Sequence, residues 1–353
     1  MYYASISNKG TGFTNQIFAL ITSLILAHNR REKVVVVDEF MDDIHKTTHT
    51  PISEILNLPE LNFFLKKTYD MIIIDKQNIQ FEILSVRYGT DSRPEVTAPH
   101  YVDLTDFFKT MYETTHALDI PPFNTIQGDP CPGVVKQCMF KYKINGYVME
   151  EIFHEYNHKN IRVNFQGPYV FTFGWINSWN ETMFTTILEN MTYHPNFVEK
   201  ANMIHLPSQV NVLHLRAEED AIAHWSKQNR MSSDDFKTYL ENKYIDLIKK
   251  YISPQEHLVL VTSCSSNRVI DFLCEKEYSY TLTPKFFKER EKNAIVDLLV
   301  ASKCNGTFIG NFNLKNKNGS SFSYYIGKQL NDVNHIYMDL DDITSPEVCS
   351  HRS

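Results

Sequence analysis

The residue types best suited to chemistry stand together in His214-Leu215-Arg216. They follow Val210, Val212 and Leu213, which have the pattern of a buried strand. An arginine keeps its charge at physiological pH, and its planar fork of N–H donors matches two phosphate oxygens. Three acids follow at once: Glu218, Glu219 and Asp220. A carboxylate beside a phosphate clamp could take a proton from a hydroxyl, so the segment favours transfer of a group from a phosphorylated donor. A surface ion pair at a strand end is the simpler alternative.

A second candidate segment, residues 10–16, lies between an expected strand, Tyr2–Ile6, and an expected helix with Thr14 as its N-cap. Its glycines let backbone N–H groups approach an anion, and the helix start adds partial positive charge. Asn15 and Gln16 could hydrogen-bond a phosphate or a sugar hydroxyl. The segment lacks the third glycine of a dinucleotide-binding fingerprint. Taken alone, a glycine turn whose Asn caps the helix explains it equally well.

A third candidate segment runs from Phe308-Ile309-Gly310-Asn311 to Ser320-Ser321-Phe322-Ser323. An expected strand ends at Gly310, a polar loop intervenes, and an expected helix opens with serines. Hydroxyls and free N–H groups at a helix start suit phosphate oxygens. A serine N-cap with Phe322 as a core residue is the competing explanation, and both can hold together.

The elements that must position these segments alternate between strands and helices. The first half shows strands at residues 2–6, 34–37, 71–74 and 169–173. The second half shows strands at residues 210–214, 257–261, 278–282, 307–309 and 336–338, with helices at 233–251, 266–276, 289–304 and 321–329. Residues 85–150 are expected to form loops and small helices around an insertion. This alternation predicts an α/β protein with two Rossmann-like domains that face each other across a cleft. The three candidate segments follow strands of both halves, so we expect them to meet in that cleft.

The composition restricts the class of protein. A chain of 353 residues, 42% apolar and 22% charged, suits a soluble protein of two domains. The formal net charge of −7 and the absence of a long basic run exclude a nucleic-acid partner. We expect no membrane span, because the longest apolar segment, residues 17–27, is too short. Without a visible signal peptide or CxxC pair, we expect a cytoplasmic protein, and a secretory lumen only if a leader has been removed.

Taken together, the three segments resemble a family. His214-Leu215-Arg216 after a strand resembles the first peptide motif shared by the α1,2-, α1,6- and protein O-fucosyltransferases. Residues 12–16, Gly-Phe-Thr-Asn-Gln, are similar to the amino-terminal Gly-Phe-Gly-Asn-Gln loop of these enzymes. The third segment is similar to their late Phe-Ile-Gly and Ser-x-Phe-Ser motifs. The likeness reaches both ends of the chain, whereas residues 60–165 show none.

The resemblance implies a GT-B fold and an inverting glycosyltransferase that needs no metal or other cofactor. Its donor would be GDP-fucose, and its acceptor a glycan hydroxyl. Residues 1–175 would form the domain on the acceptor side, 176–205 the junction, and 206–353 the domain that binds the nucleotide sugar.

Site residues carry over from the same resemblance by position. Arg216 would hold the β-phosphate, helped by Asn15 and by the backbone around Gly12 and Phe13. His214 would contact the sugar or the nucleotide. The remaining donor-binding residues would be Asp297, at the base or ribose, and Ser321, Phe322 and Ser323, around the pyrophosphate and nucleoside. Among the neighbouring acids we favour Glu219 as the general base.

Departures from the family pattern leave alternatives open. Several relatives have a second basic residue and then Asp after the Arg, whereas here Ala217 and Glu218 follow. Residues 261–264, Val-Thr-Ser-Cys, stand where relatives often carry an acid. A transferase for another donor, such as UDP-xylose or a rhamnose nucleotide, is therefore an alternative, as is a non-catalytic carbohydrate-binding protein on the same fold. Asp339-Leu340-Asp341 has the Asp-x-Asp spelling of manganese-binding transferases, but its place after the last expected strand favours a solvated turn. No metal site is predicted.

Overall fold

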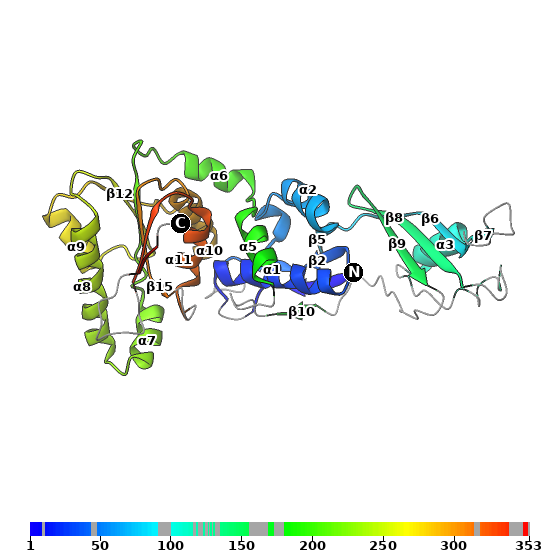
Figure 1. Ribbon diagram of the computed structural model, residues 1–353, viewed down its shortest axis with the longest axis horizontal. Helices are drawn as coiled ribbons and strands as arrows, with labels where there is room; N and C mark the ends of the chain where they lie inside the picture. The colour runs from blue at the N-terminus through cyan, green and yellow to red at the C-terminus, as the bar shows by residue number, and fades with distance from the viewer. Residues whose placement is uncertain are drawn as a thin grey trace.

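The computed structural model describes residues 1–8, 11–43, 48–90, 100–115, 118, 123, 126, 128, 130, 135–154, 169–172, 180–313, 318–338 and 349–351. Its helices and strands form three groups along the longest axis of the molecule (Figure 1). Two groups are built on parallel sheets and the third on an antiparallel sheet. The predicted α/β class with parallel sheets is confirmed. No helix in these ranges is both long enough and apolar enough to cross a membrane.

The amino-terminal sheet is parallel, with strand order β10-β1-β2-β5. Its strands are β1 (Tyr2–Ser5), β2 (Val34–Val37), β5 (Ile72–Asp75) and β10 (Val170–Phe171). Strands β2 and β5 are continuous runs of buried residues, because both faces of this sheet are covered. Helices α1 (Phe13–Asn29) and α2 (Leu58–Tyr69) pack on it. One face belongs to the core that includes α1, and the other to the core that includes β6 (Phe81–Thr90) and β8 (Gln137–Ile144). Beside the sheet lie β3 (Glu39–Met41), β4 (His49–Pro51) and the 3₁₀ helix η1 (Ile52–Glu54).

The carboxy-terminal sheet has strand order β13-β12-β11-β14-β17-β18 and is parallel except for β18. Its strands are β11 (Asn211–His214), β12 (Leu258–Val261), β13 (Tyr280–Leu282), β14 (Thr307–Gly310), β17 (Asn334–Tyr337) and β18 (Cys349–His351). Its helices are α7 (Glu219–Gln228), α8 (Ser233–Tyr251), α9 (Arg268–Glu275), α10 (Arg290–Ala301) and α11 (Ser321–Gln329). A short hairpin of β15 (Phe312–Asn313) and β16 (Asn318–Gly319) precedes α11.

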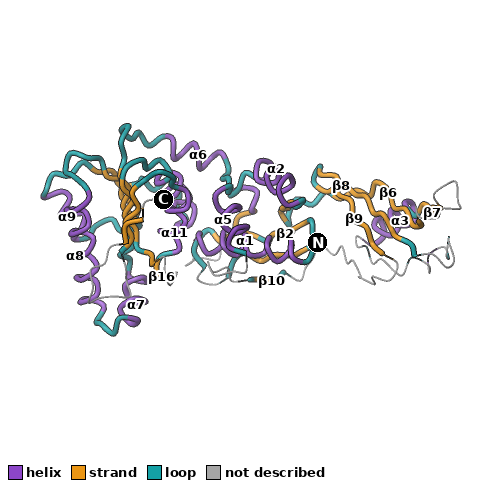
Figure 2. The backbone as a smooth tube through the Cα atoms, in the orientation of Figure 1, coloured by secondary structure: helices purple, strands orange, loops and turns teal. Residues whose placement is uncertain are grey.

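Helices lie on both sides of this second sheet, as Figure 2 shows. Alternate residues of a strand point to opposite faces. Leu213 of β11 therefore packs in the core under α8 and α9, whereas its neighbour Val212 belongs to the core that includes α10 and α11. Every expected helix and strand of this half is present, with ends shifted by up to three residues.

The expectation of loops and small helices over residues 85–150 is wrong. The described residues there form an antiparallel sheet, ordered β7-β6-β8-β9, with α3 (Thr105–Thr115) packed on β6. Its strands are β6 (Phe81–Thr90), β7 (His100–Asp103), β8 (Gln137–Ile144) and β9 (Tyr147–His154). A two-residue turn, Asn145-Gly146, joins β8 to β9 with both φ angles positive, at 45° and 86°. Asn-Gly at such a turn is a strong hairpin signal that the prediction overlooked.

An aromatic cluster joins the two parallel sheets into one core. The ring of Phe13, at the start of α1, lies 5.9 to 6.4 Å from four other rings: Phe40, Tyr193, Phe322 and Tyr325. The hydroxyls of Tyr193 and Tyr325 are 2.5 Å apart and buried. Helix α5 (Glu181–Glu189) packs on α1 and α11, and α6 (Pro195–Asn202) packs on α10. The amino end of α1 is thereby held against the carboxy-terminal half.

Candidate functional site

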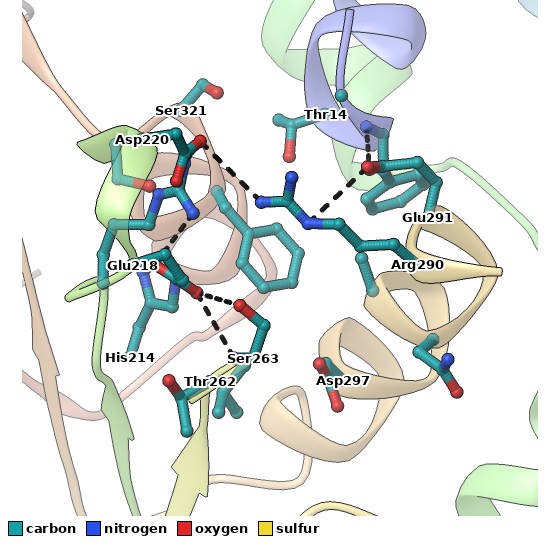
Figure 3. Close-up of a pocket in the computed structure, with 18 of the residues that line it drawn as sticks. Thr14, His214, Glu218, Asp220, Thr262, Ser263, Arg290, Glu291, Asp297 and Ser321 are labelled. Atoms are coloured by element: carbon teal, nitrogen blue, oxygen red, sulfur yellow. Dashed lines mark hydrogen bonds and ion pairs between the residues drawn. The ribbon is translucent and has the colours of Figure 1, made fainter. Parts of the chain in front are cut away.

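A pocket of about 420 Å³ lies where the two halves meet. Its walls are the amino end of α1, the loops after β11 and β12, and the beginnings of α10 and α11 (Figure 3). The sequence segments thus converge as their positions after strands predict. Eight of the candidate residues line this pocket: Gly12, Phe13, Asn15, His214, Arg216, Asp297, Ser321 and Phe322. Two candidate residues, Glu219 and Ser323, do not.

Both ends of the Arg216 guanidinium are engaged by carboxylates. Its Nη1 lies 2.8 Å from Glu218 Oε2, and its Nη2 donates to Asp220 Oδ2 at 2.7 Å. Burial lowers the pKa of Arg216, but the two carboxylates outweigh burial and raise it overall. Burial raises the pKa values of Glu218 and Asp220. The positive charge of Arg216 outweighs burial and holds both pKa values below their usual range. All three groups are therefore charged at neutral pH.

The backbone after β11 is fixed by α8. The Tyr244 hydroxyl donates to the carbonyl of His214 and accepts from the N–H of Arg216, both at 3.2 Å. Glu218 is fixed as well, since its Oε1 accepts a 2.6 Å hydrogen bond from the hydroxyl of Ser263, after β12. Glu219 is the first residue of α7 and is exposed. It lies on the solvent side of a segment whose other two acids face the pocket.

His214 is buried and neutral. Its side chain is 3% exposed, and burial lowers its pKa to about 3. Nδ1 lies 2.6 Å from the Ser323 hydroxyl, which in turn donates to Asn311 Oδ1 at 3.1 Å. Because a serine has one proton to give, this network places a hydrogen on Nδ1 of His214 and leaves Nε2 as an acceptor. The buried Ser323 thus orients the histidine, whose ring packs edge-on against Phe322.

The amino end of α1 is closed by a carboxylate from the other half of the chain. Thr14 was expected as the N-cap, and this is wrong: Gly12 occupies that position, and no side chain of α1 caps it. Instead, the Phe13 N–H donates to Oε2 of Glu291 at 2.6 Å. Glu291 belongs to α10, is 4% exposed, and has its pKa raised by burial. A carboxylate here agrees with the positive end of the helix dipole.

The two amides that follow have different surroundings. Gln16 is fully buried and bonds the backbone of Met41 in both directions, so the expectation that it contacts ligand is wrong. The Oδ1 atom of Asn15 is buried without a hydrogen-bond partner among the described residues, and Asn15 lines the pocket. A buried polar atom without a partner costs free energy, which a ligand donor would recover.

Asp297 lines the pocket as well, two turns further along α10 than Arg290. The residue is 6% exposed, and burial raises its pKa against the opposing effects of Lys285 and the nearby Thr283 hydroxyl. The Lys285 ammonium donates to Asp297 Oδ2 at 3.2 Å and to the Thr262 carbonyl at 3.0 Å. Asp297 Oδ1 is buried and has no hydrogen-bond partner within the described ranges. This end of the pocket therefore offers a cation beside an unused carboxylate oxygen.

Several pocket residues were not among the candidates from the sequence. They are Thr14, Thr262, Ser263, Lys285, Arg290, Glu291 and Asn293. Residues 285–292 form a charge-dense stretch before and into α10, which by itself is typical of a solvated helix start. Within the ranges that the structure describes, no group of three or more His, Cys, Asp or Glu could hold a metal ion. Gly10 and the Asp339–Asp341 stretch lie outside these ranges.

Comparison with solved structures identifies proteins with a similar fold. The α-1,6-fucosyltransferase NodZ, co-crystallised with GDP, aligns with a TM-score of 0.52 and 13% sequence identity, covering 100% of this chain and 99% of that one. The fucosyltransferase NodZ from Bradyrhizobium aligns with a TM-score of 0.49 and 13% identity over the same shares. POFUT1 in complex with GDP-fucose aligns with a TM-score of 0.47 and 10% identity, covering 92% of this chain and 93% of that one.

We assign the fold from the NodZ complex with GDP, because this alignment extends over nearly the whole of both chains. The protein therefore has a fucosyltransferase-like fold, as the three sequence motifs predicted. No family model matches the sequence. No curated protein matches it either.

Proposed function

We propose that this protein is an inverting, metal-independent glycosyltransferase of GT-B architecture that transfers L-fucose from GDP-fucose to a hydroxyl of a glycan. Residues 1–175 and 206–353 would be its two domains, with 176–205 as the junction. One observation carries the proposal: a single pocket gathers Arg216, the amino end of α1 and the unused oxygen of Asp297, in a chain whose fold is similar to that of a fucosyltransferase co-crystallised with GDP.

The choice of GDP over UDP rests on the part of the pocket that Asp297 and Lys285 line. Guanine presents an acceptor, O6, beside two donors, N1–H and the 2-amino group. Lys285 can donate to the acceptor, and the free Oδ1 of Asp297 can accept from the donors. Uracil has a single donor between two acceptors and would satisfy this pair less well. A site built around buried polar groups rejects a ligand that leaves them unpaired.

The part of the pocket at the amino end of α1 suits the departing diphosphate. In the transfer, the bond between the anomeric carbon and the phosphate oxygen breaks, and its electron pair stays on the phosphate. Negative charge therefore grows there while the sugar acquires oxocarbenium character. Cationic side chains and helix-end N–H groups near Gly12 would bind that charge more strongly as it develops, which lowers the barrier. His214, neutral and fixed by Ser323, offers its Nε2 to a hydroxyl of the donor.

The acceptor hydroxyl must lose its proton as it attacks, and Glu291 is the acid we propose for this step. Glu218 and Asp220 also line the pocket, but Arg216 lowers their pKa values, which makes them weak bases. Glu291 has a raised pKa, and its Oε1 has no hydrogen-bond partner in the described part of the chain. Glu219, favoured from the sequence, is exposed outside the pocket lining. Glu291 therefore replaces it in the proposal.

Isothermal titration with GDP, GDP-fucose and UDP-xylose tests the proposal, followed by an assay for released GDP in the presence of mixed glycan acceptors. We expect both guanine nucleotides to bind more tightly than UDP-xylose, and GDP to be released from GDP-fucose. Tighter binding of UDP-xylose would favour the transferase for another donor. Binding of glycans without binding of any nucleotide would overturn the proposal in favour of a carbohydrate-binding protein.

A further inference from the structure

Arg290 is a second guanidinium in the pocket, and it is not saturated. It is the first residue of α10, and its side chain is 31% exposed. In Figure 3 its guanidinium lies between Asp220 on one side and Glu291 on the other. Its Nη2 is 4.0 Å from Asp220 Oδ2, and its Nε is 3.9 Å from Glu291 Oε1. Both distances exceed those of a hydrogen bond. Within the described residues, Arg290 thus has ion-pair neighbours at long range only.

The contrast with Arg216 decides which arginine can receive a ligand. Arg216 already holds carboxylates at 2.8 and 2.7 Å through its two terminal nitrogens. A phosphate would have to displace at least one of them, with Glu218 further held by Ser263. Arg290 gives up only two long contacts when it turns to a new anion. Its donors are therefore the more readily available, although both side chains line the same pocket.

The position of Arg290 along α10 matches the length of the proposed ligand. Five residues of this helix line the pocket, and three of them, at positions 290, 294 and 297, follow one face of the helix. Arg290 and Asp297 are seven residues apart, so their backbones are separated by about 10 Å at the helical rise of 1.5 Å per residue. An extended nucleoside diphosphate spans a distance of this order from its base edge to its distal phosphate. With the base at Asp297, the diphosphate would reach Arg290.

Arg290 also supplies a charge that the sequence pattern lacks. The motif at His214-Leu215-Arg216 continues with Ala217, where several members of the resembled family carry a second basic residue. Ala217 is 6% exposed and brings no charge to the pocket. Arg290 comes from a different element, 74 positions after Arg216 in the numbering, yet its guanidinium lies 4.0 Å from Asp220, in the first turn of α7.

We propose that Arg290 is the residue that binds the distal phosphate of the nucleotide and takes up its charge in the transition state, while Arg216 stays anchored between Glu218 and Asp220 and keeps those acids from repelling the ligand. This inference rests on the proposed function. In the step itself, the acceptor oxygen bonds to the anomeric carbon as the carbon–phosphate oxygen bond breaks. The acceptor proton passes to Glu291, and the leaving diphosphate keeps the electron pair beside Arg290.

Titration of GDP and GMP into the full chain separates the two arginines, because GMP lacks the distal phosphate. The variants are Arg290→Gln, Arg290→Lys and, as a matched control, Lys288→Gln, which removes one positive charge from an exposed residue outside the pocket lining. We expect Arg290→Gln to weaken GDP binding by about tenfold to a hundredfold, the usual effect of losing a charge-assisted hydrogen bond, with little effect on GMP. Arg290→Lys should recover part of the loss, and Lys288→Gln should bind both nucleotides as the native protein does.

Two results would overturn this inference alone: unchanged GDP affinity in Arg290→Gln, or an equal loss for GDP and GMP while the far-ultraviolet circular dichroism stays native. If Arg290→Gln fails to fold, GDP and GMP are titrated into Arg290→Lys and the native protein instead. Lysine keeps the positive charge but not the guanidinium fork, so GDP binding should weaken in part while GMP binding stays unchanged. A native protein that binds neither GDP nor GMP would overturn both this inference and the proposed function.

Discussion

The backbone N–H of Phe13 donates a 2.6 Å hydrogen bond to Oε2 of Glu291, a residue 278 positions further along the chain. This bond joins the first turn of α1 to the first turn of α10 in the lining of the pocket. The Phe13 ring extends the contact by packing against Tyr325 of α11. Glu291, the proposed base, therefore belongs to the carboxy-terminal half and is held by a backbone N–H of the amino-terminal half. Its position reports directly on how the halves are assembled.

Replacement of Glu291 by Gln should separate catalysis from binding. The amide oxygen can still accept from the Phe13 N–H, so the first turn of α1 keeps its partner. The general base is lost, and kcat should fall by about two to four orders of magnitude with GDP affinity largely retained. Steady-state kinetics with GDP-fucose measure the first effect and titration the second. An unchanged kcat would show that another group accepts the proton.

The pH dependence of kcat should carry the signature of the same residue. Burial raises the pKa of Glu291, so its carboxylate form is lost as the pH falls through that raised value. Activity should therefore decline on the acidic side at a higher pH than an ordinary glutamate would impose. A kcat profile measured where the fold is intact checks this. The residual activity of Glu291→Gln should lack the acidic limb, and a limb that persists in the variant would assign the titration elsewhere.

Asp297→Asn should change which base the pocket prefers. An amide of the same shape offers one acceptor and one donor, so it no longer suits both donors of guanine. GDP binding should weaken by about tenfold or more. The native protein should prefer GDP over inosine diphosphate, which lacks the 2-amino group, and this preference should be smaller in the variant. Competitive titration of the two nucleotides measures this preference. If the variant keeps the native preference, Asp297 does not contact the base.

Ser323→Ala should act on the site through His214. The hydroxyl bonds both the histidine ring and Asn311, all of them buried, so its removal leaves polar groups without partners. The free energy of unfolding should fall by about 1–3 kcal/mol. Loss of the fixed tautomer should also weaken donor binding beyond what instability explains. Ser302→Ala, at an exposed position outside the pocket lining, is the control for loss of a serine hydroxyl. Donor binding that survives in Ser323→Ala would limit its role to stability.

Chelation should leave the reaction intact. We propose that the diphosphate charge is met by guanidinium groups and helix-end N–H groups, as at other preorganised sites. Activity with GDP-fucose should then be the same with and without excess EDTA. A loss of activity that Mn²⁺ or Mg²⁺ restores would instead assign a role to a metal, with Asp339–Asp341 as the first residues to test.

The sequence predicted the parts of the site that follow strands. His214, Arg216 and Asn15 stand where a parallel sheet places its ligands, so their convergence could be expected from local pattern alone. Arg290 and Glu291 could not be found this way, because a charged helix start has the same composition whether it faces solvent or a pocket. The N-cap at Thr14 was wrong for a related reason: the group that satisfies the Phe13 N–H comes from a distant helix.

The fold, like the site, was predicted only in part. Alternating strands and helices were recognised wherever apolar runs are continuous, as in β2 and β12. The antiparallel sheet of β6 to β9 was not predicted, because four prolines at positions 121–132 are typical of loops and precede the alternating residues Cys138, Phe140, Tyr142 and Ile144. These four side chains all point into the core beneath α3. Asn145-Gly146 was the local signal that could have revealed the hairpin.

Thermal denaturation with GDP-fucose, on the native protein and on Arg216→Ala, tests the central claim most directly. Without Arg216, Glu218 and Asp220 would turn unpaired negative charge toward the diphosphate. At a ligand concentration of about one hundred times Kd, the native protein should gain about 2.7 kcal/mol of stability, and the variant almost none. Equal stabilisation of both proteins, or of neither, would contradict a donor site built around this arginine.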